Sequence, residues 1–506
     1  MIRRVVNGSM DFLHVADSQY KPDYYKKYFL LLCTRMATFG TVCMLLLLII
    51  SCSSKTLEHR GPIGSEDRPN VLLIVVDTLR ADHLGCYGER RPTSPFIDSL
   101  ARNGVLFKQA ITVMPATLPS FSSILTSRVP RRHGVMVNGE TLSSAQVTLT
   151  EILQIRGYHT AAFISSFVLD ARFGVNQGFE YYNEELNDKE RGEKGVSRRG
   201  EKTVDAVLSW TDRYPDKEPF FIMVHLWDPH WPYMPPKGYL EMVDRKHSDS
   251  ITGTFENIMQ VRKKLIASGG KPGDDSRQLD ALYSGEVRYT DECVKRLLNG
   301  METRGFLENT IVVFTADHGE NMWEHPPNYF GHAGNIYHTS VHVPLIIMAL
   351  GRLKGGKIID HMVRSIDLAP TFLELLGIAP QQEFQGYSFA KLLMSDVSIH
   401  REEALPCFIE ANGATGMQPR AVFDGQFKLI QFPYENNRYE LFNLIEDPGE
   451  QNNLITVSEI ILQSKTSKLK NALNEWYISN PVRRSLGRVQ VSDDAREKLK
   501  ALGYIN

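Results

Sequence analysis

The sequence lacks several features that would assign it to a class at once. Its 506 residues carry 57 basic and 59 acidic side chains. A formal net charge of −2 provides no positive surplus to attract a polyanion, so we expect no nucleic-acid partner. The six cysteines are scattered without CxxC spacing, which argues against a disulfide framework or a thiolate metal site. Neither repeats nor low-complexity tracts occur. The function must therefore be read from individual sites.

One long uncharged run is present near the start of the chain. Residues 36–54 carry no charge and follow Lys26, Lys27 and Arg35, which is typical of an export signal or a membrane anchor. The run ends in Ile-Ile-Ser-Cys, which resembles a bacterial lipobox whose Cys52 would become the lipidated mature N-terminus. An uncleaved anchor is the alternative, because about 20 apolar residues span a bilayer. Both interpretations predict a membrane-tethered, extracytoplasmic protein in the periplasm or at the cell surface.

The rest of the chain alternates short apolar runs with helix-like patterns. This alternation predicts an α/β fold with a large, mainly parallel sheet sandwiched by helices. The runs interpreted as buried parallel strands are 71–76, 160–164, 220–224, 311–314 and 344–348. The helical patterns are 94–105, 148–155, 278–298 and 365–376. The densely charged stretch 188–202 is interpreted as a solvated loop.

The pattern changes towards the C-terminus. Apolar runs at 427–430 and 439–442 and a helical stretch at 457–476 predict a small α+β domain. The expected division is a signal or anchor segment over 1–54, a linker over 55–68, a large domain over 69–405 and the small domain over 406–506.

Two apolar strands each end in an aspartate. Asp77 follows the run 71–76, and Asp317 follows 311–316 and is itself followed by His318. Buried carboxylates are costly unless they are paired or bound to a cation, and an adjacent imidazole adds a nitrogen ligand. The pattern therefore predicts a metal site, although Asp77 alone is also a good helix cap.

These residues belong to a longer series of motifs in register. The stretch 70–88 resembles the opening of the sulfatase-like branch of the alkaline phosphatase superfamily. The resemblance continues over 93–95, 104–107, 117–121, 125–130, 133–135, 228–233, 315–320, 331–332, 343–346 and 447–450. It spans about residues 69–455 and implies the α/β fold of that family, with 69–405 as its catalytic domain.

The resemblance implies that Thr117 is the nucleophile, at the start of a helix whose amides favour an anion. True sulfatases carry there a cysteine or serine that is oxidised to formylglycine, followed by an arginine where this chain has Phe121. Threonine cannot be converted in that way, but phosphodiesterases and phosphoethanolamine transferases of the superfamily use threonine directly. A divalent cation lowers the pKa of such a hydroxyl. The alternative is that Thr117 merely caps the helix.

The same resemblance implies a metal site formed by Asp77, Thr117, Asp317 and His318. His318 and Thr78 stand where calcium sulfatases have further oxygen ligands, which favours Zn²⁺ or Mn²⁺ over Ca²⁺ or Mg²⁺. A second metal is left open.

The resemblance also assigns roles to several histidines. His230 and His332 match positions that contact the substrate anion, protonate the leaving group or bind a second metal. His225 and Asp228 are interpreted as structural more readily than functional, as are His325, His338 and His342. The family's Gly-Lys-x-His element has no counterpart.

The expected function is that of a metal-dependent hydrolase or transferase acting on a phosphate or sulfate ester through Thr117. The ester would belong to a small molecule, a glycan or a lipid, and the sequence does not indicate an oligomeric state. Two alternatives remain open: a non-catalytic binding protein that keeps the fold, and a true formylglycine sulfatase.

Overall fold

The structure is a computed structural model that describes most of the chain from Arg68 onward. The described residues are 68–186, 196–214, 218–247, 251–325, 330–332, 334–395, 405–411, 418–483, 493 and 496–498. The predicted signal or anchor, Cys52 and nearly all of the predicted linker lie outside them. Among the described residues, no helix is both long and apolar enough to cross a membrane.

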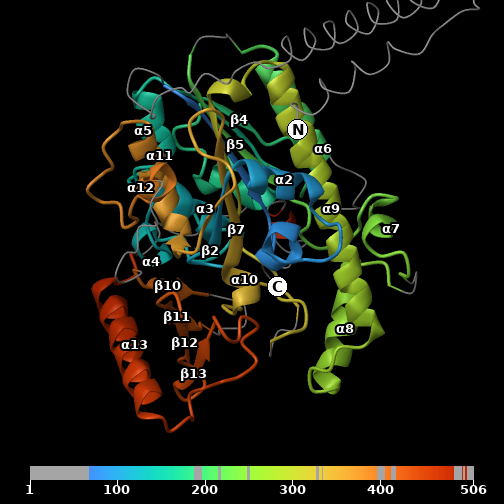
Figure 1. Cartoon of the computed structure of the whole chain (residues 1–506), viewed down its shortest axis with the longest axis vertical. Helices are drawn as coiled ribbons and strands as arrows, with labels where there is room; N and C mark the ends of the chain where they lie inside the picture. Colours follow the sequence, from blue (N-terminus) through green and yellow to red (C-terminus); the bar gives the residue numbers. More distant parts are fainter. Residues whose placement is uncertain are drawn as a thin grey trace, which may run out of the picture. The chain divides into compact units, whose positions relative to one another are not determined.

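A large mixed sheet forms the centre of the protein (Figure 1). In the described residues its order is β4-β3-β5-β1-β6-β7-β2-β8, and β9 also pairs with β2. The strands are β1 (Asn70–Val76), β2 (Val105–Ile111), β3 (His159–Phe163), β4 (Tyr181–Asn183), β5 (Phe220–Leu226), β6 (Thr310–Ala316), β7 (His342–Ala349), β8 (Lys357–Ile359) and β9 (Val363–Arg364). The predicted α/β class is confirmed.

The strand directions differ from the prediction at one place. Strands β4, β3, β5, β1 and β6 run parallel to one another, but β7 pairs antiparallel with both β6 and β2. The run 344–348 was expected to be a parallel strand, and this expectation is wrong. An apolar strand that is buried on both faces looks the same in sequence whichever way it runs.

Helices cover both faces of the sheet, with α6 and α9 on one side and α3, α5 and α11 on the other (Figure 1). The helices of the large sheet region are α2 (Pro95–Asn103), α3 (Thr117–Thr126), α4 (Pro130–His133), α5 (Leu149–Ile155), α6 (Gly200–Thr211), α7 (Tyr239–Val243), α8 (Phe255–Ala267), α9 (Asp274–Thr303), α10 (His338–Val341), α11 (Leu368–Leu375) and α12 (Ala390–Met394). The four predicted helices correspond to α2, α5, α9 and α11. Helix α5 begins where its sequence signal lies, since Thr148 and Glu151 form a reciprocal capping box.

The stretch 188–202 is not a solvated loop throughout. Arg198 and Arg199 are buried, and α6 begins directly after them. Arg198 Nη1 donates to Asn183 Oδ1 at 2.5 Å, and Arg199 Nη1 lies 3.3 Å from Asp228 Oδ1. The partners Asn183 and Asp228 lie elsewhere in the sequence, so a charge count along the chain does not reveal that these two arginines are buried.

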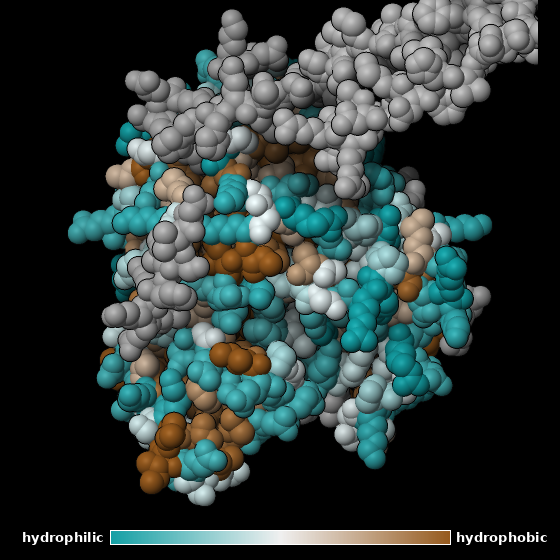
Figure 2. Space-filling model, viewed as in Figure 1, coloured by the Kyte–Doolittle hydropathy of each residue, from teal (hydrophilic) through white to brown (hydrophobic). Residues whose placement is uncertain are grey.

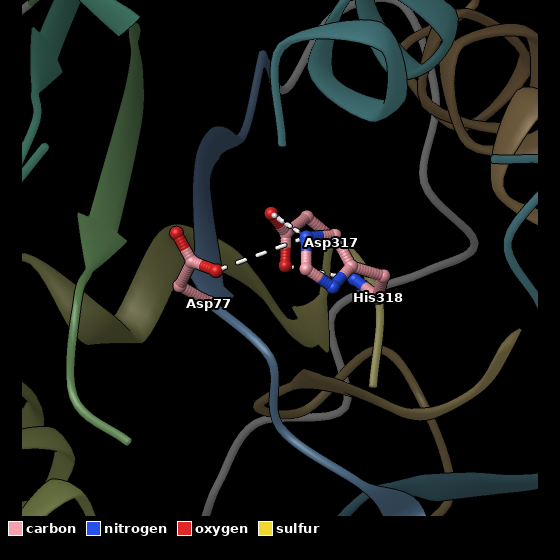
Figure 3. A group of neighbouring side chains, drawn as sticks. All are labelled: Asp77, Asp317 and His318. Carbon is pink, nitrogen blue, oxygen red and sulfur yellow. Dashed lines mark hydrogen bonds and ion pairs between the residues drawn. The ribbon is translucent and has the colours of Figure 1, made fainter. Parts of the chain in front are cut away.

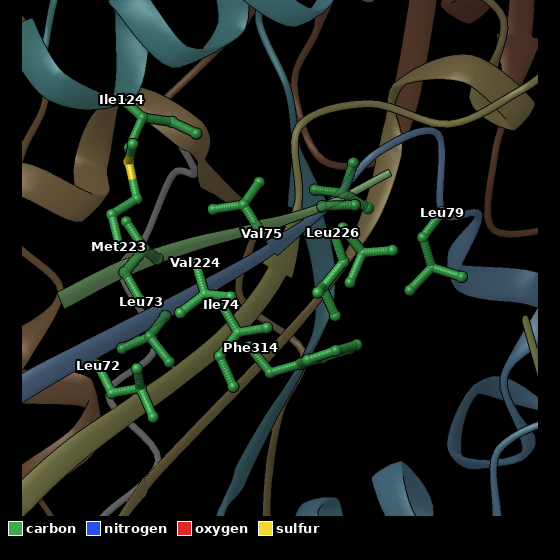
Figure 4. Packing of buried hydrophobic residues seen from close by; sticks show 14 of the residues in the cluster. Leu72, Leu73, Ile74, Val75, Leu79, Ile124, Met223, Val224, Leu226 and Phe314 are labelled. Atoms are coloured by element: carbon green, nitrogen blue, oxygen red, sulfur yellow. The ribbon is translucent and has the colours of Figure 1, made fainter. Parts of the chain in front are cut away.

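The sheet core holds α3 in place over the strand ends. Strands β1, β5 and β6 are buried along almost their whole length. Figure 4 shows Ile124 of α3 lying against Met223 of β5, beside the packed side chains of β1. Burial of such side chains contributes roughly 1.5–3 kcal/mol each. This packing fixes where the first residue of α3 lies.

A second sheet forms the C-terminal part, as the predicted α+β domain requires. Strands β10 (Cys407–Glu410), β11 (Arg420–Phe423), β12 (Phe427–Phe432) and β13 (Arg438–Asn443) pair antiparallel in that order, and α13 (Ile460–Ser479) covers them. One apolar cluster joins this sheet to the large one, because Ile111 and Val341 share it with Ile409 and Phe442. The face in Figure 2 is mainly hydrophilic, with apolar side chains in separate groups. The domain boundary near 405 stays a prediction.

Candidate metal centre and catalytic site

The two predicted aspartates lie side by side because their strands are neighbours. Strands β1 and β6 pair in parallel with Val76 opposite Ala316, so Asp77 and Asp317 leave the same edge of the sheet. The backbone then holds Asp317 in place: Thr78 N donates to its Oδ1 at 3.2 Å, and His318 N donates to the same atom at 2.7 Å. Ligands in such sheets bind beyond the carboxyl ends of the strands.

Asp77, Asp317 and His318 form one buried group of three candidate ligands (Figure 3). Their ligand atoms all lie within 4.8 Å of one another. His318 Nε2 is 3.4 Å from Asp317 Oδ2 and 3.8 Å from Asp77 Oδ1. His318 Nδ1 lies 2.9 Å from the carbonyl of Gly319, so it carries the proton and leaves the Nε2 lone pair facing the carboxylates.

No lysine or arginine of the described residues pairs with the carboxylates of this group. Burial raises the pKa of Asp317 to about 8, and the Asp77 carboxylate adds to the rise. The pKa of Asp77 is raised well above its usual range by burial and by nearby Glu320, although the Thr117 hydroxyl opposes this. Burial lowers the pKa of His318 to about 4, which favours the neutral imidazole that a metal requires.

A divalent cation fits these residues. Asp77 Oδ1 and Asp317 Oδ2 are buried and accept no hydrogen bond from the part of the chain that the structure describes, which is costly for a carboxylate oxygen. Two carboxylate oxygens and one imidazole nitrogen are ligands that suit Zn²⁺ or Mn²⁺. The structure thus brings together three of the four predicted ligands in a geometry open to a metal.

Thr117, the fourth predicted ligand, lies next to the group formed by Asp77, Asp317 and His318. It is the first residue of α3, and its Oγ1 lies 3.4 Å from His318 Nε2. The cap position of this helix is Ala116, and no side chain caps it, so the alternative in which Thr117 is only a cap is wrong. Leu118 N donates to Asn138 Oδ1 at 2.9 Å, which anchors the first turn. The helix N-terminus faces the group and favours an anion there.

The two predicted catalytic histidines lie beside this group and are buried. The His332 ring centroid is 4.3 Å from that of His318 and 5.3 Å from that of His230. His230 stacks on Trp227 at 3.7 Å, and its Nδ1 donates to the Trp231 carbonyl at 2.6 Å. These contacts hold the His230 ring in a fixed orientation beside His332.

Two residues at the site were not predicted to be there. His225 Nε2 lies 3.2 Å from Asp77 Oδ2, so this histidine belongs to the site. Glu320 is buried, and its Oε1 lies 3.2 Å from His332 Nδ1. The signal for His225 was its place near the end of β5, which pairs with β1 so that His225 lies opposite Val75. Glu320 follows His318 by two residues and offers no separate signal.

The remaining predicted residues lie elsewhere. Asp228 accepts from Gly200 N at 2.9 Å and pairs with Arg199, a structural role as expected. His325 stacks on Tyr337 at 3.9 Å between ring centroids, and His338 stacks on His342 at 4.4 Å. These three histidines are not part of the metal-ligand group.

Comparison with known proteins agrees with this arrangement. The sulfatase family pattern matches residues 69–378, which include Asp77, Thr117, Asp317 and His318. The chain belongs to the sulfatase family. Residues 329–478 also match the pattern described as N-sulphoglucosamine sulphohydrolase, C-terminal. The predicted family membership is therefore confirmed, and with it the hydrolase class.

Individual relatives of this sulfatase-family chain are distant but extend over most of its length. It is 25% identical over 456 residues to the ulvan-active sulfatase of Formosa agariphila, covering 84% of this chain and 85% of that protein. A protein solved in complex with its substrate D-glucosamine-2-N,6-O-disulfate has a TM-score of 0.69 at 22% identity, covering 82% and 98%. The phosphonate monoester hydrolase of Agrobacterium radiobacter has a TM-score of 0.65 at 20% identity, covering 84% and 99%. The two solved structures show the shared fold.

One position departs from the sulfatase pattern inside the site. Phe121, where true sulfatases have an arginine, is fully buried, and its ring meets His225 edge-on at 5.3 Å between centroids. It therefore packs against a residue that contacts Asp77 rather than offering a charge to a substrate anion.

Proposed function

We propose that the chain is an exported, metal-dependent enzyme that hydrolyses or transfers a sulfate or phosphate ester, with Thr117 as its nucleophile. The observation that carries the proposal is the position of Thr117 Oγ1, at the start of α3 and 3.4 Å from His318 Nε2. A nucleophile in this position has acid–base groups and an anion-favouring helix terminus within reach.

Asp77, Asp317, His318 and the Thr117 hydroxyl would hold the cation, with Zn²⁺ or Mn²⁺ favoured. When bound, it would neutralise charge on the ester oxygens and lower the pKa of the Thr117 hydroxyl. One relative is named an ulvan-active sulfatase, and one structural neighbour was solved with a sulfated glucosamine as its substrate. Both observations support a sulfated glycan as the substrate of this chain. The phosphonate hydrolase among the structural neighbours supports a phosphorus ester as the alternative.

In the proposed chemical step, groups of this chain supply the attacking atom and carry the proton. Thr117 Oγ1 forms a bond to sulfur or phosphorus while the bond to the leaving oxygen breaks. Its proton passes to the imidazole of His230 or His332, and from there to the leaving oxygen, so that no charge accumulates. Burial lowers the pKa of His332 to about 3, so its imidazole is neutral before the reaction begins. The oxygen of water or of an acceptor alcohol then forms a bond to the same sulfur or phosphorus while the bond to Thr117 Oγ1 breaks. The proton of the attacking group passes through the imidazole to Thr117 Oγ1, which regenerates the hydroxyl.

Replacement of the nucleophile tests this proposal. Thr117→Ala is expected to lower turnover of an aryl sulfate or aryl phosphate by about 10³-fold or more, because no other hydroxyl replaces the attacking atom. Thr117→Ser keeps the hydroxyl and serves as the matched control, with much of the turnover retained. Circular dichroism checks that both variants fold. Undiminished turnover by Thr117→Ala would refute the assignment.

A second candidate is a binding protein without catalytic activity, and Phe121 is the observation that favours it. A buried phenyl ring supplies no cation for the substrate anion. In that case the purified chain, loaded in turn with Zn²⁺, Mn²⁺ and Ca²⁺, would turn over none of the aryl sulfate, phosphate monoester and phosphate diester substrates.

Export is proposed from the run 36–54 and Cys52 alone. If Cys52 is lipidated, cells grown with labelled palmitate will label the unmodified chain but not Cys52→Ala. Label retained by Cys52→Ala would refute the lipoprotein, and a membrane-bound but unlabelled chain would instead support an uncleaved anchor.

A further inference from the structure

His225 is a buried histidine at the carboxyl edge of the large sheet that the proposed chemical step does not use. It is the last residue but one of β5 and lies opposite Val75 of β1. The Asp77 N–H donates to the Leu226 carbonyl at 2.9 Å, so the backbone of Asp77 is fixed beside this end of β5. The side chains of His225 and Asp77 are both fully buried. Their contact is therefore set by the pairing of β5 with β1.

Hydrogen bonds determine which nitrogen of the His225 ring carries the proton. Ser165 N donates to Nδ1 at 3.3 Å, so Nδ1 offers its lone pair and the proton of the ring is on Nε2. Nε2 lies 3.2 Å from Asp77 Oδ2 and therefore donates to that oxygen. The Ser165 hydroxyl also donates to the His225 carbonyl at 2.5 Å, and the Phe121 ring meets the imidazole edge-on at 5.3 Å between centroids. These contacts hold the ring in one orientation.

The two aspartates of the metal-ligand group are held in the same way. Asp317 Oδ1 accepts from Thr78 N at 3.2 Å and from His318 N at 2.7 Å. Asp77 Oδ2 accepts from His225 Nε2. The other oxygen of each aspartate lies near His318 Nε2, Asp317 Oδ2 at 3.4 Å and Asp77 Oδ1 at 3.8 Å (Figure 3). N–H groups thus occupy one oxygen of each carboxylate and leave the other for a cation. The backbone does this for Asp317, whereas a side chain does it for Asp77.

The number of oxygens that the aspartates leave free bears on the choice of metal. With one oxygen from each aspartate, the imidazole of His318 and the Thr117 hydroxyl, the group offers four donor atoms. Zn²⁺ is usually held by about four such ligands, whereas Ca²⁺ takes about six to eight oxygens and often binds both oxygens of one carboxylate. An Asp77 carboxylate that was free to offer both oxygens would suit Ca²⁺ better.

We propose that His225 is a positioning residue that makes the site select Zn²⁺ over Ca²⁺. Its Nε2–H holds Asp77 Oδ2, so that Asp77 offers a single oxygen and the group offers one nitrogen and three oxygens in all. Phe121 supports this arrangement, because its apolar ring brings neither a charge nor a competing hydrogen-bond donor to the imidazole. That a cation binds to this group rests on the proposed function.

The test is the ratio of the Zn²⁺ affinity to the Ca²⁺ affinity of the metal-stripped full chain, measured by competition with chelating dyes of known affinity. His225→Met removes the N–H, whereas His225→Gln keeps an amide N–H on a side chain of similar length. His225→Met is expected to lower the ratio by about tenfold or more, the usual effect of losing a group that orients a metal ligand. His225→Gln is expected to retain most of the ratio.

His133→Met is the matched control outside the metal-ligand group. His133 is also buried, and its Nδ1 also accepts a backbone N–H, that of Val135 at 3.2 Å. Its Nε2, however, lies 2.9 Å from the Ser123 hydroxyl instead of a carboxylate. The affinity ratio should therefore be unchanged in this variant. Circular dichroism checks that each variant folds.

Two further measurements do not depend on affinity. The visible absorption bands of bound Co²⁺ are strong for a four-coordinate ion and weak for a six-coordinate one, so they should be strong in the unmodified chain and weaker in His225→Met. Nitrogen NMR of the metal-free unmodified chain with labelled histidine should show the His225 proton on Nε2. The His225 signal is identified by its absence from His225→Gln. This measurement decides even if His225→Met does not fold.

The possible results separate the inference from the proposed function. A lower affinity ratio in His225→Met alone, with weaker Co²⁺ bands, supports the inference. An unchanged ratio in His225→Met, an equal loss in His225→Gln or His133→Met, or a His225 proton on Nδ1 overturns it and leaves the Thr117 assignment intact. An unmodified chain that binds neither ion overturns both the inference and the metal-dependent function. Retained turnover in Thr117→Ala removes the proposed nucleophile but does not change the affinity ratios.

Discussion

The two sheets of this protein both bury carboxylates, but they compensate them differently. In the C-terminal sheet, Glu450 meets Lys428 of β12 with Nζ 2.8 Å from Oε1, and both side chains are fully buried. At the edge of the large sheet, Asp77 and Asp317 are equally buried, yet within the described residues neither pairs with a lysine or arginine. A lysine of the protein therefore pairs with the carboxylate at one site, whereas the carboxylates at the other have the unpaired charge that a bound cation would neutralise.

The carboxylates of the two sites are equally buried, but the Glu450–Lys428 pair has a structural role and the Asp77–Asp317 pair is a candidate functional site. Glu450 Oε2 also accepts a hydrogen bond from His338 N, so that the Glu450–Lys428 pair ties the C-terminal sheet to the segment before β7. The Asp77–Asp317 pair instead has no lysine or arginine beside it in the described residues and lies next to a threonine hydroxyl. Burial alone does not mark a functional carboxylate, whereas burial without a built-in counter-charge does.

The largest expected effect comes from removing a carboxylate at the uncompensated site. Asp317→Asn keeps the side-chain shape but removes a charged ligand, so turnover of an aryl ester should fall by about 10³-fold and bound metal should be lost on dialysis. Metal analysis and kinetics measure both. The metal-free variant should fold at least as stably as the metal-free unmodified chain. Full metal content in Asp317→Asn would contradict the assignment.

Breaking the compensated pair should affect stability instead. Lys428→Met leaves the Glu450 carboxylate buried without its partner and should lower the free energy of unfolding by about 3–5 kcal/mol, measured in urea. Metal content should stay unchanged. Lys428→Met combined with Glu450→Gln should recover part of the loss, because no buried charge remains. An equal loss in the double variant would show that packing, not charge, sets the cost.

The pH dependence of metal-free stability should differ between the unmodified chain and Asp317→Asn. The pKa of Asp317 is raised to about 8 in the folded chain, above its value of 3.8 in the unfolded one. Its contribution is therefore fully favourable below about pH 4 and is lost as pH rises towards 8. Melting temperatures across this range should fall more steeply for the unmodified chain. Added Zn²⁺ should reduce the difference at pH 8, and identical slopes without metal would contradict the prediction.

The smallest effect is expected for a surface pair that joins α13 to the turn between β11 and β12. Lys465 Nζ lies 3.0 Å from Asp424 Oδ2, and the two side chains are 34% and 22% exposed. Lys465→Gln should change the free energy of unfolding by about 0–1 kcal/mol, because water competes for both charges. Urea unfolding of Lys465→Gln and of Lys428→Met under the same conditions compares the two ion pairs directly. A loss as large as that of Lys428→Met would mean that burial is not what distinguishes the two pairs.

Part of the candidate site could be predicted from local sequence. Asp77 and Asp317 each follow a strand of apolar residues, and parallel strands that are neighbours bring such residues together. The family resemblance added Thr117, His230 and His332, all of which the structure places around one point. His225 was not assigned to the site because nothing local shows that β5 lies beside β1. The sequence shows that Phe121 replaces the arginine of the sulfatase pattern. It does not show that the Phe121 ring contacts His225.

The sequence by itself determined the fold class, the strand ends that carry the aspartates, and the start of α5 at its capping box. These depend on residue spacing and on local hydrogen bonds within a few positions. Only the tertiary structure decided the direction of β7, the burial of Arg198 and Arg199, the Lys428–Glu450 pair and the contact between His225 and Asp77. Each of these depends on which distant segments become neighbours, and the free energy of a buried charge is set by such neighbours rather than by its place in the chain.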